Sequence, residues 1–436
     1  MRTLIRDLPK SVGSTATIQG WLHKKRLLGG LNFLTIRDRS GIAQSLAEDK
    51  YELEKLRGLQ IGTVVELTGA VVADERAPGG VELHDVKVNV LVPVTDEPPI
   101  EIDKPLDHKS ENLDTLFDNR VIGLRNLQEQ TIFKVQAAIM RSAREYFRDN
   151  EFTEMSTPKL LSEPTEGGAE VFKMDYFGKT ATLAQSAQFY KQEMVGVFER
   201  VYEIGKTYRA EPSATPRHMT EFMTIDAEMG FITFDDLLGT VGGLLHRVVD
   251  DTWSQYETEL KRWNASKAKL STEIPRMSMA EIHEKYTKAT KEPITDEKDL
   301  TPDEERWVCD YAKKNLGSEA VFVVDWPADS MKFYHRKNAE NPKLAERADL
   351  LFRGLEIATI SMRENRYDVL VEQLKTLAGG DPEDPGFKYY LMAFKYGMPV
   401  HGGFGMGLER LTEKILGLAN IKEATLFPRD IKRLTP

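Results

Sequence analysis

Cysteine is almost absent from this 436-residue chain, which contains only Cys309. A single thiol excludes an internal disulfide framework and is typical of proteins from a reducing compartment. The sequence also lacks any apolar run near the roughly 20 residues that a membrane-spanning helix needs, and its opening MRTLIRDLPK does not resemble an export signal. We therefore expect a cytoplasmic protein that is not embedded in a membrane.

Net positive charge is lacking as well, because 59 Lys and Arg stand against 69 Asp and Glu, a formal charge of -10. A uniformly acidic surface suits nucleic acid poorly, since binding to phosphates requires cations. The deficit is uneven, however. Residues 1–92 contain 13 basic and 11 acidic side chains, a net charge of +2, and the remainder carries -12. The first segment can therefore approach a polyanion although the whole chain is acidic.

The length of the chain predicts two or three domains, because one core seldom serves so many residues. Alternating apolar runs separated by glycine-rich breaks predict five strands in residues 1–92. An oligonucleotide-binding (OB) barrel and a small barrel without a ligand fit this pattern about equally. Residues 93–125 are rich in proline and charge, which indicates a linker. Residues 126–436 alternate helices and strands, as in an α+β domain, with a polar helical insertion around 255–318.

Two segments of the second part have unusual composition at its start and near its end. FRDNEFTEMSTPKLL, from residue 147, predicts a helix end followed by a strand that closes near Pro158, and alone it is a weak signal. HGGFGMGLERLTEKILGL, from residue 401, predicts a glycine-rich strand that a ligand can approach closely, followed by a helix. Neither G-x-x-x-x-G-K nor G-x-G-x-x-G is present, which excludes Walker and Rossmann phosphate sites. Arg410 at the helix start is suited to a terminal phosphate.

The segment VYEIGKTYRAEPSATPRHMTEFMTIDAEMGF, from residue 201, lies between these two and is the most informative. Its pattern predicts a strand with Arg209 and Glu211 on one face, and then a turn-rich loop with Arg217 and His218. Charges on an apolar strand need partners, and ATP supplies them through its phosphates and its adenine amine. Phe222 is then a stacking surface for the base. The alternative is a surface hairpin with salt bridges.

Taken in order, the three segments resemble motifs 1, 2 and 3 of class II aminoacyl-tRNA synthetases. The surrounding residues resemble the aspartyl branch of that class in its short archaeal-like form, from Arg2 to the final LFPRDIKRLTP. The resemblance implies an antiparallel catalytic sheet flanked by helices, a homodimer formed partly through the first segment, and magnesium-bound ATP. It also implies the reaction, which is activation of L-aspartate with ATP and its transfer to tRNA(Asp).

The resemblance assigns roles in ATP binding position by position. Asp349 and Glu356 match the family's magnesium-binding carboxylates, and oxygen ligands combined with ATP phosphates suit Mg2+. Arg209 at the α-phosphate and Arg410 at the γ-phosphate are the expected catalytic residues, because they stabilise the charge that builds during in-line attack by the aspartate carboxylate. The complete expected ATP site consists of Arg209, Glu211, Arg217, His218, Phe222, Glu356 and Arg410.

The aspartate pocket is expected to combine cations for the side-chain carboxylate with acids for the α-ammonium. Lys191 matches the aspartyl pattern, whereas asparaginyl enzymes, which share the architecture, carry an acid there. Arg363 matches the arginine that pairs bidentately with the substrate carboxylate. The other expected members are Glu166, Gln188 and Asp226. The run Ala358-Thr359-Ile360 replaces glycines that the family usually has before Ser361, which raises the question whether side chains there crowd the ribose or the amino acid.

Residues of the predicted barrel match an anticodon-reading surface. Phe33, Gln44 and Glu82 match residues that stack on and hydrogen-bond the central anticodon base, although Phe33 alone would also suit a core. His23 and Pro78 match the pair found in relaxed bacterial versions. Since Pro78 offers neither a backbone N–H nor a charge, we expect tRNA(Asn) to be charged with aspartate too, for later conversion by an amidotransferase.

Other functions stay open at this point. A strict tRNA(Asp)-only enzyme is one, and an asparaginyl-tRNA synthetase, disfavoured by Lys191, is another. A related amide-forming synthetase would lack the barrel, and an inactive RNA-binding paralogue would have lost charges such as Arg209 and Asp349. The glycines of loop 161–175 also suggest a segment that closes over aspartate.

Overall fold

The structure, a computed structural model, describes residues 2–27, 32–106, 108, 112–164, 170–213 and 215–436. It contains two compact units, one formed by Met1–Gln130 with Pro436 and the other by Thr131–Thr435. Within the described ranges, no helix is both long and apolar enough to cross a membrane.

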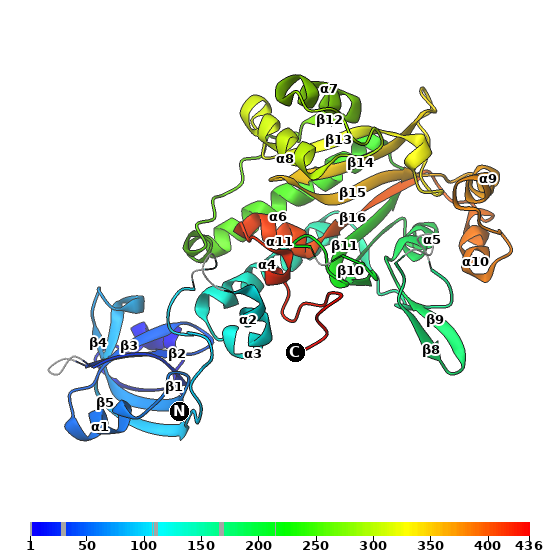
Figure 1. Ribbon diagram of the computed structural model, residues 1–436. Coiled ribbons are helices and arrows are strands. Elements are labelled where there is room, and N and C mark those ends of the chain that lie inside the picture. Colours follow the sequence, from blue (N-terminus) through cyan, green and yellow to red (C-terminus); the bar gives the residue numbers. More distant parts are fainter. Residues whose placement is uncertain (1, 28–31, 107, 109–111, 165–169, 214) are drawn as a thin grey trace. The chain divides into compact units, whose positions relative to one another are not determined.

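A closed five-stranded barrel forms the core of the first unit (Figure 1). Its strands are β1 (Thr15–Leu27), β2 (Asn32–Arg37), β3 (Ile42–Leu46), β4 (Val64–Ala73) and β5 (Val81–Val92), in the order β1-β2-β3-β5-β4. Every second residue of β4 from Val65 to Val71 is buried, which is the two-residue period of a strand with one face inside. A helix, α1 (Lys50–Arg57), follows β3 and begins after Asp49, which accepts hydrogen bonds from two backbone N–H groups. The prediction of five strands and an OB-type barrel is confirmed.

The segment expected to be a linker, residues 93–125, is more ordered than its composition suggests. It contains α2 (Leu113–Asp118) and α3 (Arg120–Gly123). Arg120, which is buried, donates a hydrogen bond to Glu129 at 3.0 Å. The prediction missed these helices because each is shorter than the window over which a helical period becomes visible.

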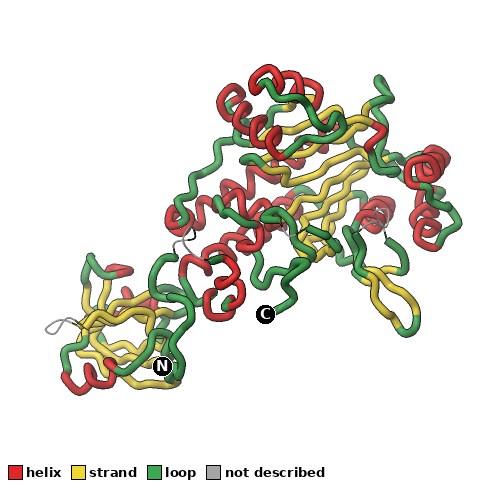
Figure 2. The backbone as a smooth tube through the Cα atoms, viewed as in Figure 1, coloured by secondary structure: helices red, strands yellow, loops and turns green. Residues whose placement is uncertain are grey.

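An eight-stranded sheet dominates the second unit (Figure 2), in the order β12-β13-β14-β15-β16-β11-β10-β6. The strands are β6 (Thr153–Glu154), β10 (Arg200–Tyr208), β11 (Glu221–Gly230), β12 (Arg276–Ser278), β13 (Ala320–Pro327), β14 (Leu344–Phe352), β15 (Leu355–Arg363) and β16 (His401–Gly407). Neighbouring strands are antiparallel except at the two edges, where β6 pairs with β10 and β12 with β13 in parallel. The antiparallel catalytic sheet flanked by helices that the resemblance implied is confirmed, with parallel pairing added at its two edges.

Helices cover the sheet and carry parts of the site. Two long helices, α4 (Leu127–Asp149) and α6 (Phe234–Arg262), pack on one face together with α11 (Leu408–Leu416), and their apolar side chains form the main core with the sheet. A second core joins α5 (Gln188–Phe198), α9 (Tyr367–Ala378) and α10 (Pro385–Phe394). A small separate sheet contains β7 (Leu160–Leu161), β8 (Lys173–Tyr176) and β9 (Lys179–Leu183).

The region expected to be a helical surface insertion, residues 255–318, is only partly that. It contains the end of α6, then β12, α7 (Met279–Thr290) and α8 (Pro302–Tyr311), with a π-helical turn at Ala312–Leu316. Because β12 pairs with β13, this region supplies an edge strand of the main sheet. Ile282 and Val308 of its helices are fully buried against β13. A strand of three residues leaves too little alternation to be recognised in a sequence.

Candidate active site

Charged residues from three strands lie on the face of the sheet opposite α6. Across the strands, Asp226 of β11 is opposite Gly405 of β16, Gly405 is opposite Thr359 of β15, and Thr359 is opposite Asp349 of β14. Cross-strand partners point to the same side of a sheet. The neighbouring residue Ala227 faces the core instead. The sheet thus brings together residues that are more than a hundred positions apart in the chain.

The glycines of β16 make room for the carboxylates of β11. A Cβ atom on Gly403 would overlap Oε2 of Glu228, and a Cβ atom on Gly405 would lie 3.2 Å from Oδ1 of Asp226. The predicted glycine-rich strand is confirmed. The groups that approach its glycines in this structure are carboxylates of the protein itself. The carboxylates of Asp226 and Glu228 therefore lie against the backbone of β16, at positions that have no side chain.

Two cations and two anions form a buried cluster beside these glycines. Lys191 of α5 donates hydrogen bonds of 2.8 Å to Asp226 and to the carbonyl oxygen of Phe404. Arg363 of β15 donates to both carboxylate oxygens of Glu228, at 2.7 and 3.2 Å. All four side chains are at most 5% exposed. The ammonium of Lys191 also lies 3.6 Å from Oε2 of Glu228. This is too long for a hydrogen bond, so of its three N–H donors one can serve a ligand.

A series of hydrogen bonds links Arg363 to His401 through the side chains of two glutamines. Nδ1 of His401 lies 2.8 Å from the carbonyl oxygen of Pro399, so it carries the proton, and Nε2 accepts from the Gln192 amide at 3.1 Å. Gln192 in turn accepts from Gln188 at 3.0 Å, and Gln188 accepts a long bond, 3.5 Å, from Arg363. Burial lowers the pKa of His401, in keeping with a neutral ring. The chain fixes which way both amides point.

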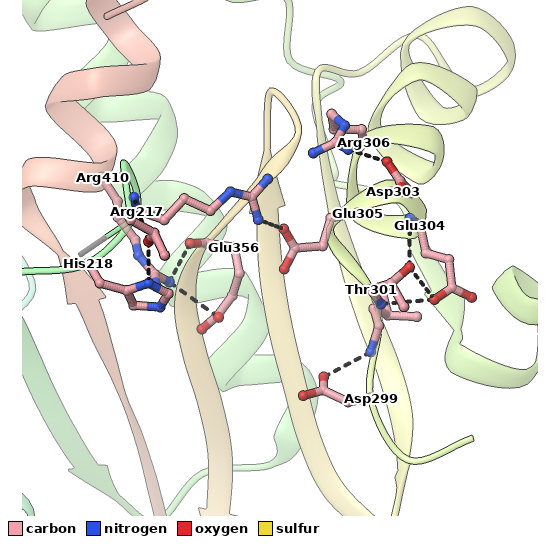
Figure 3. Close-up of polar contacts among 12 residues, drawn as sticks. Arg217, His218, Asp299, Thr301, Asp303, Glu304, Glu305, Arg306, Glu356 and Arg410 are labelled. Atoms are coloured by element: carbon pink, nitrogen blue, oxygen red, sulfur yellow. Dashed lines mark hydrogen bonds and ion pairs between the residues drawn. The ribbon is translucent and has the colours of Figure 1, made fainter. Parts of the chain in front are cut away.

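A second group of charges lies along β15 and the β10–β11 loop (Figure 3). Arg410 of α11 donates to the carbonyl oxygen of Glu356 at 2.8 Å and to its carboxylate at 3.2 Å. Arg217 extends from the loop to Glu305 of α8, 2.9 Å away. His218, beside it, has Nδ1 2.6 Å from the hydroxyl of Thr215. Each of the two arginines therefore has a carboxylate partner.

The expectation that Arg209 and Glu211 share one face of a strand is wrong. Strand β10 ends at Tyr208, and both residues belong to the loop that follows. Pro212 has no N–H and cannot extend the ladder. The guanidinium of Arg209 nevertheless lies over the ring of Phe222, 5.5 Å from its centroid, so these two residues are together.

Asp349 and Glu356 provide oxygen atoms that suit a hard cation. Arg347 donates to Oδ2 of Asp349 at 2.8 Å, whereas Oδ1 is buried and has no hydrogen-bond partner among the described residues. Burial, together with the charge of Glu356, raises the pKa of Asp349 to about 7 despite Arg347. No cluster of three or more Asp, Glu, His or Cys side chains that could hold a metal occurs in the described part of the chain. A cation here would take further ligands from phosphates or water, as Mg2+ does.

The run that replaces the family's glycines on β15 divides between the two faces of the sheet. Ala358 and Ile360 are buried in the core on the α6 side and do not reach the site. Thr359 is on the site's face, where its hydroxyl donates to Glu356 at 2.8 Å. Ser361 accepts a hydrogen bond from Arg363. Two of the three departures therefore fill the core, and the third supports an acidic residue of the site.

The comparison with protein families agrees with this geometry. The family described as "tRNA synthetases class II (D, K and N)" matches residues 112–431. This chain belongs to the class II aminoacyl-tRNA synthetases. The family described as "OB-fold nucleic acid binding domain" matches residues 16–91, which form the barrel.

Relatives of this synthetase match it over their full length. It is 41% identical to the Aspartate--tRNA(Asp/Asn) ligase of Thermus thermophilus, with all of both chains covered. It is 38% identical to the ligase of the same name from Deinococcus radiodurans, with 100% of this chain and 99% of the relative covered. Among solved structures, an asparaginyl-tRNA synthetase from Pyrococcus horikoshii complexed with asparaginyl-adenylate has a TM-score of 0.91 at 30% identity over 100% of both chains.

The residues expected in the aspartate pocket of the synthetase meet in one place, apart from Glu166, which lies outside the described residues. Gln188, Lys191, Asp226 and Arg363 form the buried cluster and its support. The sequence analysis missed Glu228, although it is two residues after Asp226 on the same strand and therefore on the same face. It also missed Gln192, His401 and Glu305, which have no distinctive local pattern.

The residues expected to read the anticodon lie in the first unit. Phe33 is partly exposed between buried Asn32 and Leu34, so it points out of the barrel and is not a core residue. Gln44 donates to the carboxylate of Glu82 at 2.8 Å across β3 and β5. Burial and the charge of Arg37 lower the pKa of His23, which sits at an irregularity of β1. Pro78 begins a short 3-10 turn, Pro78–Gly80, before β5.

Proposed function

We propose that this synthetase activates L-aspartate with ATP and transfers it to tRNA(Asp), and that tRNA(Asn) is a second acceptor. The supporting observation is the buried cluster of Lys191, Arg363, Asp226 and Glu228. Its cations suit the side-chain carboxylate that distinguishes aspartate from asparagine, and its acids suit the α-ammonium. The names of the full-length relatives from Thermus thermophilus and Deinococcus radiodurans point to the same substrates.

The charged groups along β15 then bind ATP. Arg209 contacts the α-phosphate and stabilises the charge that develops there as the aspartate carboxylate attacks in line. Arg217, His218 and Arg410 hold the outer phosphates, which leave as pyrophosphate when the bond to the α-phosphate breaks. The attacking carboxylate belongs to aspartate, so no nucleophile from the protein is needed. Asp349 and Glu356 would hold Mg2+, which would neutralise charge on the phosphates.

The barrel selects the transfer RNA. Phe33 stacks on the central anticodon base, and Gln44 and Glu82 bind its polar edge. His23 and Pro78 lie near the third base, which alone separates the aspartate and asparagine anticodons. Because Pro78 has no N–H to donate, both acceptors are charged. The enzyme works as a homodimer, and an amidotransferase converts aspartyl-tRNA(Asn).

Pyrophosphate exchange with ATP tests the amino acid. Aspartate, asparagine and lysine are supplied in parallel, and exchange is expected with aspartate alone. Exchange with asparagine instead would identify an asparaginyl enzyme, and no exchange with any of the three would support an inactive RNA-binding protein.

Aminoacylation of two transcripts tests the second acceptor. The transcripts differ only at the third anticodon base, and both are expected to be charged with aspartate. A difference in kcat/KM beyond about 10³-fold, roughly 4 kcal/mol, would show a strict tRNA(Asp) enzyme instead.

A further inference from the structure

The first turn of α8 is rigidly built and directs one acidic side chain at the sheet. Thr301 caps the helix, accepting from the backbone N–H of Glu304 while its own N–H and hydroxyl donate to the Glu304 carboxylate. Pro302 occupies the first helical position, where its fixed φ favours a helix. The next acidic residue, Glu305, points toward the guanidinium of Arg217 (Figure 3). The cap therefore fixes the place from which Glu305 acts.

Glu305 reaches a functional arginine from a distant part of the chain. Its Oε2 lies 2.9 Å from Nη1 of Arg217, 88 positions away, and the two side chains are 15% and 29% exposed. The loop that carries Arg217 is held at a second point, where Pro216 accepts a hydrogen bond from Ile421 at 3.0 Å. Both ends of Arg217 are therefore held: its backbone by the hydrogen bond to the adjacent Pro216, and its guanidinium by Glu305.

The contact leaves Arg217 able to bind a ligand. A guanidinium carries five N–H donors, and Glu305 uses a single terminal nitrogen. Arg410 has the same arrangement, since its Nη1 contacts Glu356. The charges of Arg217, Glu356 and Arg410 all act on Glu305, whose pKa is raised by burial. Glu305 thus belongs to the group of charges assigned to the outer phosphates of ATP.

We infer that Glu305 is a positioning residue of the ATP site, which holds the guanidinium of Arg217 where the terminal phosphates bind. The inference rests on the proposed function only in that Arg217 binds ATP. It gives region 255–318 a part in catalysis: α8 supplies the outer wall of the phosphate site. Without Glu305, the long side chain of Arg217 samples many rotamers and must be ordered by ATP itself.

The test compares Glu305→Gln, which keeps the shape of the side chain, with Asp303→Asn as a matched control. Asp303 lies in the same helical turn, is exposed and pairs with Arg306, so its loss changes the charge of the turn without touching the site. In pyrophosphate exchange, Glu305→Gln is expected to raise the KM for ATP about tenfold, the effect of losing a partly covered charged contact. The kcat and the KM for aspartate should change less than about threefold, and Asp303→Asn should resemble the wild type.

A double-mutant cycle separates positioning from a general structural effect. If Glu305 acts through Arg217, then Glu305→Gln adds no further rise in KM to an Arg217→Ala variant. Additive effects, an unchanged KM for ATP, or a lower KM, as for a carboxylate that competes with phosphate, would overturn the inference. Equilibrium binding of ATP without amino acid repeats the comparison, so the result does not depend on aspartate being the substrate. Absence of exchange with aspartate would count only against the proposed function.

Discussion

Replacing Lys191 with methionine should separate recognition of aspartate from binding of ATP. Methionine keeps an unbranched stem of similar length but removes the ammonium, which donates to Asp226 and to the carbonyl of Phe404. The Lys191 side chain is 1% exposed. Water cannot easily take over these contacts at a site so deeply buried. The change therefore leaves two acids, Asp226 and Glu228, facing a single remaining cation.

Two magnitudes follow from this geometry. Removing one partner of a buried ion pair typically costs about 3–5 kcal/mol of stability, because the other charge stays buried. If the free N–H of Lys191 meets the side-chain carboxylate of aspartate, its loss removes a charge-assisted hydrogen bond of about 1.5–3 kcal/mol. That corresponds to a fall of roughly 10- to 150-fold in kcat/KM for aspartate. The KM for ATP should not change.

Pyrophosphate exchange, with each substrate varied in turn, measures the two effects, and thermal unfolding measures the stability. Lys261→Met is the control, since Lys261 forms an exposed pair with Glu257 on α6 and should cost less than about 0.5 kcal/mol. If Lys191→Met folds and keeps its kcat/KM for aspartate within about threefold of the wild type, Lys191 does not contact the substrate and the reasoning fails.

Three further predictions concern stability and reactivity. Burial raises the pKa of Glu409 from 4.5 to about 7, so between these two values the folded state retains a proton that the unfolded chain has released. Stability therefore falls as the pH rises from about 4.5 to about 7. Glu409→Gln should remove at most about 3 kcal/mol of this fall in urea unfolding, and identical pH profiles would contradict it. Gly403→Ala should lower the unfolding temperature, because the new Cβ atom forces Glu228 aside. Gly239→Ala adds a Cβ atom in open space on α6 and should stabilise the protein by about 0.5–1 kcal/mol. Equal effects of the two variants would refute the packing argument. Burial raises the pKa of the Cys309 thiol to about 12, so a disulfide reagent should label it only on unfolding, and fast labelling of the native protein would show otherwise.

Local patterns in the sequence predicted the elements that are long and regular. The five barrel strands and the strand with Gly403 and Gly405 have clear alternation or composition, and each was found. The short elements were not, because β12 has three residues and α3 has four. The predicted end of β10 was also wrong, because no residue between Tyr208 and Pro212 is typical of a strand end.

Likewise, only some residues of the candidate site could be predicted from local patterns in the sequence. Glu228 could have been predicted from the sequence, because it follows Asp226 at the two-residue spacing that places both side chains on one face of the strand. Glu305 was not, since its contact with Arg217 joins segments 88 positions apart and depends on how α8 begins. Gln192 and His401 matter only through their partners. Local periodicity therefore reveals the surfaces of strands and helices, whereas the pairing of charges between elements depends on the fold.

The balance of charge around Lys191 also constrains how such an enzyme can evolve. Two cations and two anions neutralise one another in the pocket before any substrate arrives, and each comes from a different position on α5, β11 or β15. A lineage that exchanged Lys191 for an acid would pass through an ancestor with three buried carboxylates and one arginine. That ancestor would fold poorly unless a second substitution had come first. The order in which mutations arise is therefore restricted, and replacing Lys191 with an acid requires a second, coordinated substitution.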